Sequence, residues 1–485
     1  MAYSALSEFV EKLEHVNDLK RISVPVSVEL EITEIADRNV KSSGPALLFE
    51  KPVDKDGNIF DVPVLINAYA SDERMNMALG VESLDDVADE IADLLEIKPP
   101  EGLVEKVKML PKLARISSFA PKNVGTAPCQ QFVETENPDL FSIPALKCWP
   151  DDGGRYITFG HIYSRNPVSN RRNVGLYRVQ IFDSKTAGMH MHLHHDGAQN
   201  FLASSKEGKK MEMAIALGGD PVLVYAASAP LPPGIDELSL AGFLRRKSVE
   251  LVKCKTVDVE VPSSSDIVIE GYLNPGELRE EGPFGDHTGW YSLEDDYPVF
   301  HVTAITRKLN PIYPTTIVGK PPMEDYWLGK ASGRIFLPLM KMQLPEIVDV
   351  HMPSEGVFHN MVIVSIKKSY PYHARKVMAA LWGMGQMSLS KILVIVDDDI
   401  NVHDTSEVAW KVLGSIDPRR DLMFVDGPVD ALEHASSMPH IGSKVGIDGT
   451  KKWKEEGFNR RWPDVITMDE DIISLVSQRW KEYGF

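Results

Sequence analysis

Two acidic residues within residues 279–291 have a spacing that suits acid–base chemistry. Glu281 and Asp286 flank a Pro-Phe-Gly turn that contains Phe284, and Trp290 follows shortly after. Two carboxylates among apolar groups lose hydration and repel each other, which raises the pKa of one and keeps it protonated. One of them could then deliver a proton. The alternative is an acidic surface turn, and the apolar Phe284 and Trp290 argue against it.

Residues 171–182 carry two further candidates on a strand-like run. Arg178 could bind a carboxylate through two hydrogen bonds, and Asn173 could offer a neutral oxygen to a hard cation. The ordinary alternative for Arg178 is a surface cation extending from a strand. Residues five apart in a regular strand face opposite sides, so a shared site requires a bulge, or Asn173 in the preceding turn.

Four of the 14 histidines lie within residues 188–199, namely His190, His192, His194 and His195. In an extended strand the first three share one face and His195 points to the other. Imidazoles can bind a metal ion, which would need further ligands from elsewhere. A polar strand face whose histidines are satisfied by neighbouring groups is the alternative.

Two weaker patterns lie in the last third of the chain. Residues 383–388 resemble part of a dinucleotide-binding loop, but they follow a helix and lack the third glycine, so a helix C-terminus explains them better. Lys391 and the acids at 397–399 flank an apolar strand. Acids at a strand end can bind Mg²⁺, although a solvated sheet edge is the commoner case.

The periodicity of apolar residues predicts the elements that position these groups. A helix at 6–16, strands at 46–49 and 62–66 and a helix from the capping pair Ser83 and Asp86 to Leu95 indicate a mixed α/β region. The Pro-rich residues 95–102 indicate a loop, and we place the domain boundary near residue 120. The next apolar runs, separated by turn residues, predict strands at 156–163, 174–182, 189–194, 222–226, 249–261, 267–273 and 299–306.

Such a density of short strands is typical of a β-barrel or a split barrel. Val257, Val259 and Val261 alternate with polar residues and predict a half-exposed antiparallel strand. The last third returns to α/β, with strands at 362–366 and 392–396, a helix at 372–384 and a helix capped by Asp404 and Glu407. The continuous apolar run at 392–396 predicts a parallel strand covered on both faces.

Composition limits the classes of function. The 52 Lys and Arg against 70 Asp and Glu give a net charge of -18, the wrong sign for binding nucleic acid or anionic lipid. The three cysteines are scattered without a CxxC pair, which favours neither a disulfide framework nor a zinc site. No apolar stretch reaches the roughly 18 residues of a transmembrane helix, and the acidic N-terminus does not read as a secretion signal. We therefore expect a cytoplasmic protein.

These segments, in this order, resemble the UbiD family of decarboxylases, which use prenylated FMN. The resemblance covers nearly the whole chain and includes CWPDDGGRYIT, RRNVGLYRVQIFD, MHLHHDGA and EEGPFGDHTG. It implies an α/β, or α+β, multidomain fold in which a central split β-barrel of the flavin-reductase type is flanked by two α/β domains. We place the domains at 1–120, 121–325 and 326–485, with cofactor and metal in the second and a role in oligomerisation for the third.

The resemblance also implies how the cofactor is held. Asn173, His194 and Glu237 match the family's metal ligands, through which Mn²⁺ or Mg²⁺ would bridge to the cofactor phosphate, and Lys391 matches a lysine that supports the same phosphate. A K⁺ site nearby is implied without assigned ligands. The other three histidines of the cluster are expected to line the cofactor edge or to bind ions weakly. A flavin prenyltransferase would supply the cofactor.

Arg178, Glu281 and Asp286 match the family's catalytic network beside the flavin ring. By this resemblance Arg178 orients the substrate carboxylate, Glu281 keeps Arg178 in place and assists cofactor maturation, and Asp286 donates the proton that replaces CO₂. The modified flavin accepts the electron pair left by C–C cleavage. The expected reaction is the reversible, non-oxidative decarboxylation of a small aromatic acid by a homo-oligomer, either a dimer or a hexamer.

One position departs from the cinnamate-type ferulic acid decarboxylases, which have Glu where this chain has Asp286. The shorter side chain favours an aromatic hydroxyacid such as the 4-hydroxy-3-polyprenylbenzoate of quinone biosynthesis, although other aromatic acids fit equally. A polyprenylated substrate would bring the protein to a membrane surface. Two alternatives stay open: a metal-dependent hydrolase that uses the histidine-rich strand, and a non-catalytic or partner-dependent subunit of a carboxylase complex.

Overall fold

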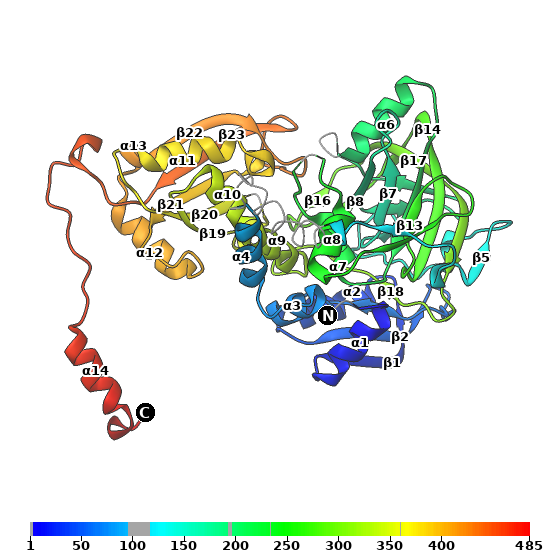
Figure 1. The fold of residues 1–485 in the computed structure, drawn as a ribbon, viewed down its shortest axis with the longest axis horizontal. Coiled ribbons are helices and arrows are strands. Elements are labelled where there is room, and N and C mark those ends of the chain that lie inside the picture. The colour runs from blue at the N-terminus through cyan, green and yellow to red at the C-terminus, as the bar shows by residue number, and fades with distance from the viewer. Residues whose placement is uncertain (1–2, 96–116, 193–195, 233, 359) are drawn as a thin grey trace, which may run out of the picture.

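The chain folds into three regions that follow one another in sequence (Figure 1). The computed structural model describes residues 3–95, 117–192, 196–232, 234–358 and 360–485. The elements of the N-terminal region are α1 (Leu6–His15), β1 (Leu19–Ser27), α2 (Glu31–Lys41), β2 (Ala46–Val53), β3 (Val64–Ile66), α3 (Asp72–Leu79) and α4 (Leu84–Leu95). Their sheet has the order β1-β2-β3-β18, so its last strand, β18 (Tyr313–Pro314), comes from much later in the chain.

The predicted elements of this first region are confirmed. The opening helix, both strands and the helix to Leu95 are present. Ser83 caps α4 as expected, because its Oγ accepts the N–H of Asp85 at 3.1 Å and its own N–H donates to Asp86 Oδ2 at 3.1 Å. The buried face of α1 shares one apolar core with helices of the central region. The first two regions therefore pack as one unit.

The central region is built on a curled sheet of nine strands, with the order β6-β9-β10-β17-β14-β11-β7-β8 and with β5 pairing to β17 (Figure 1). All pairs within this sheet are antiparallel. The strands are β5 (Phe132–Glu134), β6 (Arg155–Ile157), β7 (His161–Arg165), β8 (Arg172–Leu176), β9 (Val179–Ile181), β10 (Thr186–Met189), β11 (Met211–Leu217), β14 (Ile267–Glu281) and β17 (Asp295–Arg307).

Smaller elements complete the region. They are β4 (Lys122–Asn123), β12 (Glu250–Lys253) and β13 (Glu260–Pro262), which form a small sheet, the hairpin of β15 (Phe284–Gly285) and β16 (Tyr291–Ser292), and the helices α6 (Asp196–Lys206), α7 (Val222–Ser228) and α8 (Glu237–Arg245). The two long strands β14 and β17 pair with shifts in register, which bend the ribbon that carries the hairpin.

The expected strands at 156–163 and 174–182 each form two shorter strands, and two further expected strands are wrong. Residues 222–226 form helix α7, because a short, fully apolar run fits a buried helix as well as a buried strand, and Asp220 Oδ1 accepts the N–H of Val222 at its start. Residues 249–261 form β12 and β13 with a turn between them, held by the carboxylate of Glu270, which accepts backbone N–H groups of that turn. The alternating valines are buried, although only Val261 lies in a strand.

The C-terminal region is an α/β layer whose sheet has the order β19-β20-β21-β23-β22. Its elements are α9 (Asp325–Ile335), α10 (Leu337–Gln343), β19 (Ile347–His351), β20 (Met361–Ile366), α11 (His373–Trp382), β21 (Ile392–Asp397), α12 (Thr405–Ser415), α13 (Pro418–Asp421), β22 (Leu422–Pro428), β23 (Ile441–Asp448) and α14 (Glu470–Gln478).

The prediction for the apolar run 392–396 is confirmed. It forms β21, which is parallel to β20 on one side and to β23 on the other. Leu393 and Ile395 pack with the side chains of α11, and Val394 and Val396 pack with those of α12. Both faces of this strand are therefore covered.

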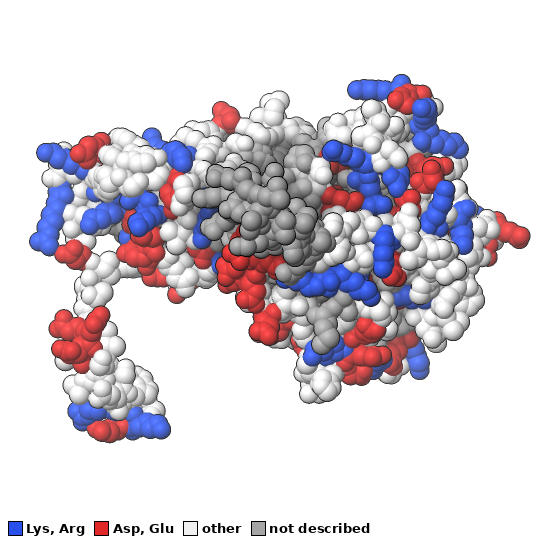
Figure 2. Space-filling view, viewed as in Figure 1, with Lys and Arg blue, Asp and Glu red and all other residues white. Residues whose placement is uncertain are grey.

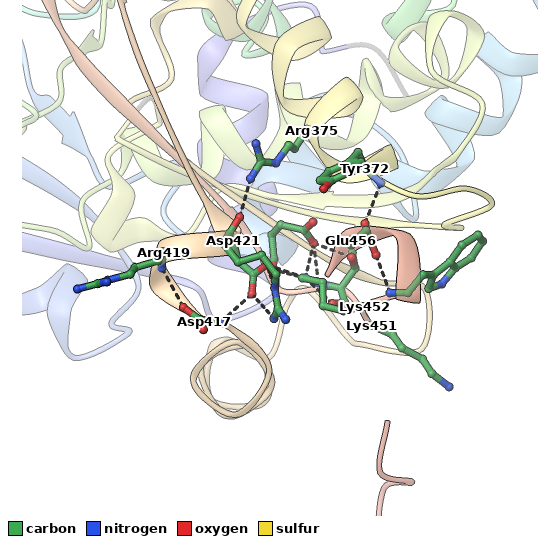
Figure 3. Close-up of polar contacts among 12 residues, drawn as sticks. Tyr372, Arg375, Asp417, Arg419, Asp421, Lys451, Lys452 and Glu456 are labelled. Carbon is green, nitrogen blue, oxygen red and sulfur yellow. Dashed lines mark hydrogen bonds and ion pairs between the residues drawn. The ribbon is translucent and has the colours of Figure 1, made fainter. Parts of the chain in front are cut away.

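The last part of the chain leaves the body. Residues 448–456 are held to the C-terminal sheet by a buried set of ion pairs (Figure 3). Beyond them the chain runs outward and ends near α14, which lies apart from the three regions (Figure 1) and has no buried residue. None of the helices in the described ranges is long and apolar enough to span a bilayer.

Surface charge agrees with the acidic composition. On the face shown in Figure 2, acidic side chains gather over α4, whose twelve residues include five acids. Elsewhere on that face, Lys and Arg are interspersed with Asp and Glu in the described part of the chain.

Candidate active site

Arg178 lies at a break between two strands of the curled sheet. Strand β8 ends at Leu176 and β9 begins at Val179, so Tyr177 and Arg178 leave the regular strand. Arg178 Nε and Nη2 each donate to the carboxylate of Glu281 at 2.9 Å, and Nη1 donates to Asp286. The strand is therefore interrupted between Asn173 and Arg178, as a site shared by these two residues requires. Arg178 is buried and hydrogen-bonded to two acids, so it is not a surface cation.

The two acids come from the ribbon that ends in the β15–β16 hairpin. Glu281 is the last residue of β14 and is fully buried, and Asp286 directly follows β15 and is 8% exposed. The ring of Phe284 lies under Arg178, with 4.7 Å from the guanidinium carbon to the ring centroid. Asp152 accepts the N–H of Gly285 at 2.8 Å and ties the hairpin to the body. The surface-turn alternative is wrong, although Trp290 points outward.

The charge state of the acids differs from the expectation. Burial raises the pKa of Glu281, but hydrogen bonds from His190 and the charge and hydrogen bonds of Arg178 outweigh burial and lower it. Burial also raises the pKa of Asp286, but the hydrogen bond from His287 and the charge of Arg178 hold it far below its usual range. The prediction that repulsion keeps one acid protonated is wrong, because Arg178 lies between the two carboxylates and neutralises their repulsion.

His287 is a member of this site that the sequence reasoning missed. Its Nδ1 lies 3.0 Å from Asp286 Oδ1, and its backbone N–H donates to the same oxygen at 2.7 Å. Burial lowers the pKa of His287, but the hydrogen bond and charge of Asp286 raise it to about 9. The imidazole is therefore protonated at neutral pH. The signal that could have found it is its position directly after the expected proton donor.

The histidine cluster is divided between described and undescribed parts of the chain. Strand β10 ends at Met189, so the prediction of a strand through His194 is not met, and His194 and His195 lie outside the described residues. His190 Nδ1 donates to Glu281 at 2.9 Å, and its Nε2 lies 2.6 Å from His192 Nε2. Burial lowers the pKa of His190 and keeps it neutral. This histidine supports Glu281.

Asn173 and Glu237 meet around Tyr177. Asn173 lies in β8, Glu237 is the first residue of α8, and both side chains influence the pKa of Tyr177. Within the described chain, Asn173 Nδ2 and Glu237 Oε2 are buried without a hydrogen-bond partner. Burial raises the pKa of Glu237 to about 7, and the nearby acids Asp236 and Asp196 add to the shift.

The buried, unpaired polar atoms of Asn173 and Glu237 fit a cation site. A carboxylate oxygen is a ligand for Mn²⁺ or Mg²⁺, and rotation of the Asn173 amide would present a second oxygen. A bound cation would satisfy both groups and offset the local acidic charge. No three His, Cys, Asp or Glu side chains converge as a metal site among the described residues.

Lys391 lies at the start of β21 in the C-terminal sheet. Its Nζ forms an ion pair with Glu433 Oε2 at 2.9 Å. Its assignment to the cofactor phosphate stays a prediction.

A small cleft opens beside the cluster, where the central hairpin faces the C-terminal region. Its lining residues are His287, Gly319, Pro321, Asp325, Tyr326, Ser354, Val357 and Phe358. The ring centroids of His287 and Phe358 are 5.6 Å apart, and those of Trp290 and His434 are 4.7 Å apart. The hairpin that carries Asp286 thus contacts the C-terminal region at two places.

Fold and site together define a class of protein: a multidomain α/β enzyme with a buried arginine and two carboxylates that can bind an acid and move a proton. Three family models match the chain. They are the UbiD models described as the N-terminal, Rift-related and C-terminal domains of 3-octaprenyl-4-hydroxybenzoate carboxy-lyase, and they match residues 10–95, 122–321 and 326–449. The chain therefore belongs to the UbiD family and is an enzyme of its carboxy-lyase class.

Relatives and solved structures agree along the whole length. An uncharacterized protein of Archaeoglobus fulgidus is 49% identical over 99% of both chains. The UbiD-class enzyme HmfF from Pelotomaculum thermopropionicum, solved in complex with FMN, has 29% identity and a TM-score of 0.80 over 98% of this chain and 99% of its own. The vanillic acid decarboxylase of Sedimentibacter hydroxybenzoicus has 25% identity and a TM-score of 0.83 over 100% of this chain and 98% of its own. These matches confirm the mixed α/β multidomain fold.

Proposed function

We propose that this enzyme catalyses the reversible, non-oxidative decarboxylation of a hydroxylated aromatic acid with prenylated FMN. The observation that carries the proposal is the buried Arg178 with Glu281 and Asp286 as its two acid partners. The similar HmfF has been solved with FMN and, in an evolved dimeric form, with prFMN. The similar vanillic acid decarboxylase supports an aromatic hydroxyacid as substrate. A 4-hydroxy-3-polyprenylbenzoate of quinone biosynthesis is one such acid.

Each residue of the cluster has one task in this proposal. Arg178 binds the substrate carboxylate and orients it for loss as CO₂. Glu281 fixes Arg178 through two hydrogen bonds of 2.9 Å and is itself held by His190. Asp286 delivers the proton that takes the place of CO₂. The prenylated flavin, when bound, supplies the electron-accepting group that carbanion chemistry needs.

In this proposal Asn173, His194 and Glu237 would hold a divalent cation, which would supply positive charge for the cofactor phosphate. The unpartnered buried atoms of Asn173 and Glu237 support it. Mn²⁺ and Mg²⁺ both accept such ligands together with phosphate oxygens. Lys391 adds positive charge toward the same phosphate, and K⁺ is a further candidate ion.

The finer features of the fold and assembly belong to the same proposal. The curled central sheet supports a split barrel of the flavin-reductase type. Homo-oligomeric assembly is supported by the exposed apolar residues Ile472, Ile473 and Leu475 on α14. A flavin prenyltransferase supplies the cofactor, and the protein works in the cytoplasm, at a membrane surface if its substrate is polyprenylated.

The decisive experiment is expression together with a flavin prenyltransferase, followed by absorption spectroscopy and mass spectrometry of the bound flavin. The loaded enzyme is then given a panel of hydroxylated aromatic acids and CO₂ release is measured. We expect turnover of at least one acid, and loss of that turnover in Asp286→Asn. A preparation that turns over without flavin and stops with a chelator would instead support a metal-dependent hydrolase. Flavin binding without turnover would support a partner-dependent subunit.

A further inference from the structure

The strongest unexplained feature of the site is that its expected proton donor, Asp286, lies against both the guanidinium of Arg178 and the imidazole of His287. Asp286 accepts from Arg178 and from His287, and both partners stabilise its ionised form. A carboxylate held in this state cannot deliver a proton unless another group first supplies one. Of the two side chains described as hydrogen-bonded to Asp286, Arg178 keeps its protons because a guanidinium is not deprotonated in proteins, whereas the imidazole of His287 can release one.

The charges around His287 favour an internal transfer. Arg178 and His287 are positive, and Glu281 and Asp286 are negative, so these four buried groups balance. Moving one proton from His287 to Asp286 leaves one positive and one negative group and keeps the balance. Taking the proton for Asp286 from solvent would leave an excess buried positive charge, which is costly in a medium of low polarity.

The other face of the imidazole looks toward the C-terminal region. Asp325 of α9 lines the same cleft as His287, and burial raises the pKa of Asp325 to about 6. A carboxyl group that titrates near neutral pH beside an open cleft can pass protons from solvent. The groups that face His287 from its surroundings are Asp286 with Arg178 behind it, the ring of Phe358, and the acids Asp325 and Asp430.

We propose that His287 is a positioning residue that stores the proton of the reaction and passes it through Asp286 to the carbon that has lost CO₂, with Asp325 and the cleft returning a proton to His287. The C–C bond breaks and leaves its electron pair on carbon. The proton of the Asp286 carboxyl joins that carbon, and the Nδ1 proton of His287 moves to the Asp286 carboxylate. Neutral His287 keeps its Nε2 proton, so its ring turns about χ2 to bring the bare Nδ1 to the cleft, regains a proton there and turns back to Asp286. This inference rests on the proposed decarboxylase function.

The first test needs no cofactor. In the purified chain with ¹³C-labelled histidine, the imidazole signal of His287, assigned by its loss in His287→Gln, should titrate near pH 9. In Asp286→Asn it should titrate at least two units lower. Titration of His287 at its ordinary value in the unmodified chain would overturn the ion pair and the inference with it.

The second test uses the loaded enzyme with any acid it turns over. Gln can still donate a hydrogen bond to Asp286 but cannot transfer a proton, so His287→Gln should lower kcat about 100-fold with little change in KM. It should also remove the alkaline fall in kcat that we expect near pH 9. Added imidazole should restore part of the kcat of His287→Ala. The matched control is His434→Gln, which contacts the same hairpin through Trp290 and should leave kcat within twofold.

The results separate the two claims. If the unmodified loaded enzyme turns over no aromatic acid, the decarboxylase function fails while the titration still reports on the His287–Asp286 pair. If the enzyme turns over and His287→Gln keeps both its kcat and its alkaline limb, the decarboxylase stands and the proton store is wrong. Loss of kcat without rescue by imidazole and without a changed pH profile would assign His287 a packing role and would also overturn the inference.

Discussion

The Arg178 cluster of the central region and the Lys452 cluster of the C-terminal region both bury several charges, yet they are built differently. Lys452 Nζ donates to the Asp448 backbone oxygen at 2.6 Å, to Asp448 Oδ1 at 2.9 Å and to the Thr450 backbone oxygen at 2.6 Å (Figure 3). Lys368 Nζ donates to both carboxylate oxygens of Glu456 at 2.7 Å. These bonds tie backbone segments to one another.

The two clusters differ in whether their polar groups are all bonded to fixed partners. An ammonium has three donors, and Lys452 spends all three on fixed acceptors. Glu456 likewise accepts the backbone N–H groups of Tyr372 and Trp453. In the Arg178 cluster one guanidinium contacts two carboxylates, Asp286 also contacts the His287 imidazole, and a cleft reaches His287. The two clusters therefore differ in that an imidazole of the Arg178 cluster lines a cleft, whereas Lys452 is buried with every donor paired.

The largest effect should follow from Arg178→Lys. Lysine keeps the charge but cannot bind two acids and a substrate carboxylate in a planar fork, so kcat/KM of the loaded enzyme should fall about 1000-fold, equivalent to ~4 kcal/mol. CO₂ release measures this. Arg279→Lys is the matched control, because Arg279 is half exposed on the same ribbon, and it should change kcat/KM by less than threefold. Equal losses of kcat/KM in the two variants would mean that turnover depends no more on the buried Arg178 than on the half-exposed Arg279.

Lys452→Met should affect stability and not chemistry. Removing one partner of a buried ion pair leaves Asp448 without its counter-charge, while Asp421 keeps its ion pair with Arg420, and the loss costs about 3 kcal/mol of unfolding free energy. Urea denaturation followed by fluorescence checks this, with the exposed Lys451→Met as control. The kcat of the folded variant should match that of the unmodified enzyme. A large loss of kcat at unchanged stability would mean that this cluster also serves catalysis.

Binding of Mn²⁺ tests the proposed cation site at Asn173 and Glu237. At about 100 times its dissociation constant, a bound cation should stabilise the protein by about 2.7 kcal/mol, and a chelator should remove this. A thermal shift of the flavin-free chain measures it. Glu237→Gln should abolish the shift, whereas Glu277→Gln, which changes an exposed acid on β14, should keep it. An undiminished thermal shift in Glu237→Gln would mean that the cation binds at another place in the protein.

The smallest effect concerns Glu456 and pH. Burial raises its pKa, but the hydrogen bond from Lys368 and the backbone donors outweigh burial and lower it. A depressed folded-state pKa contributes stability above the unfolded value near 4.5, and this is lost as pH falls through the folded value. Glu456→Gln should therefore cost about 1.5 kcal/mol at pH 7 and less below pH 4. Its exposed neighbour, in Glu455→Gln, should show no such pH dependence.

The local sequence pattern was sufficient to predict helices and strands whose conformation does not depend on contacts with distant residues. The cap of α4 at Ser83 and the doubly covered strand β21 follow from side-chain spacing, and both are present as predicted. The same reasoning failed for α7, since the apolar run of five residues at 222–226 has no period that separates helix from strand. It also failed for the turn before β13, which depends on Glu270 from a neighbouring strand.

The order of the motifs by itself determined the family. It also predicted Arg178, Glu281 and Asp286 as the candidate site and, for a site shared with Asn173, a bulge or Asn173 in the preceding turn. Only the tertiary structure decided the charge state of that site. The sequence spacing predicted two neighbouring acids. Whether both are ionised depends on the guanidinium of Arg178 between them and on the imidazoles of His190 and His287 beside them, which only the fold brings there. Coulomb energy depends on distance and burial, and the chain acquires both only when its strands are paired.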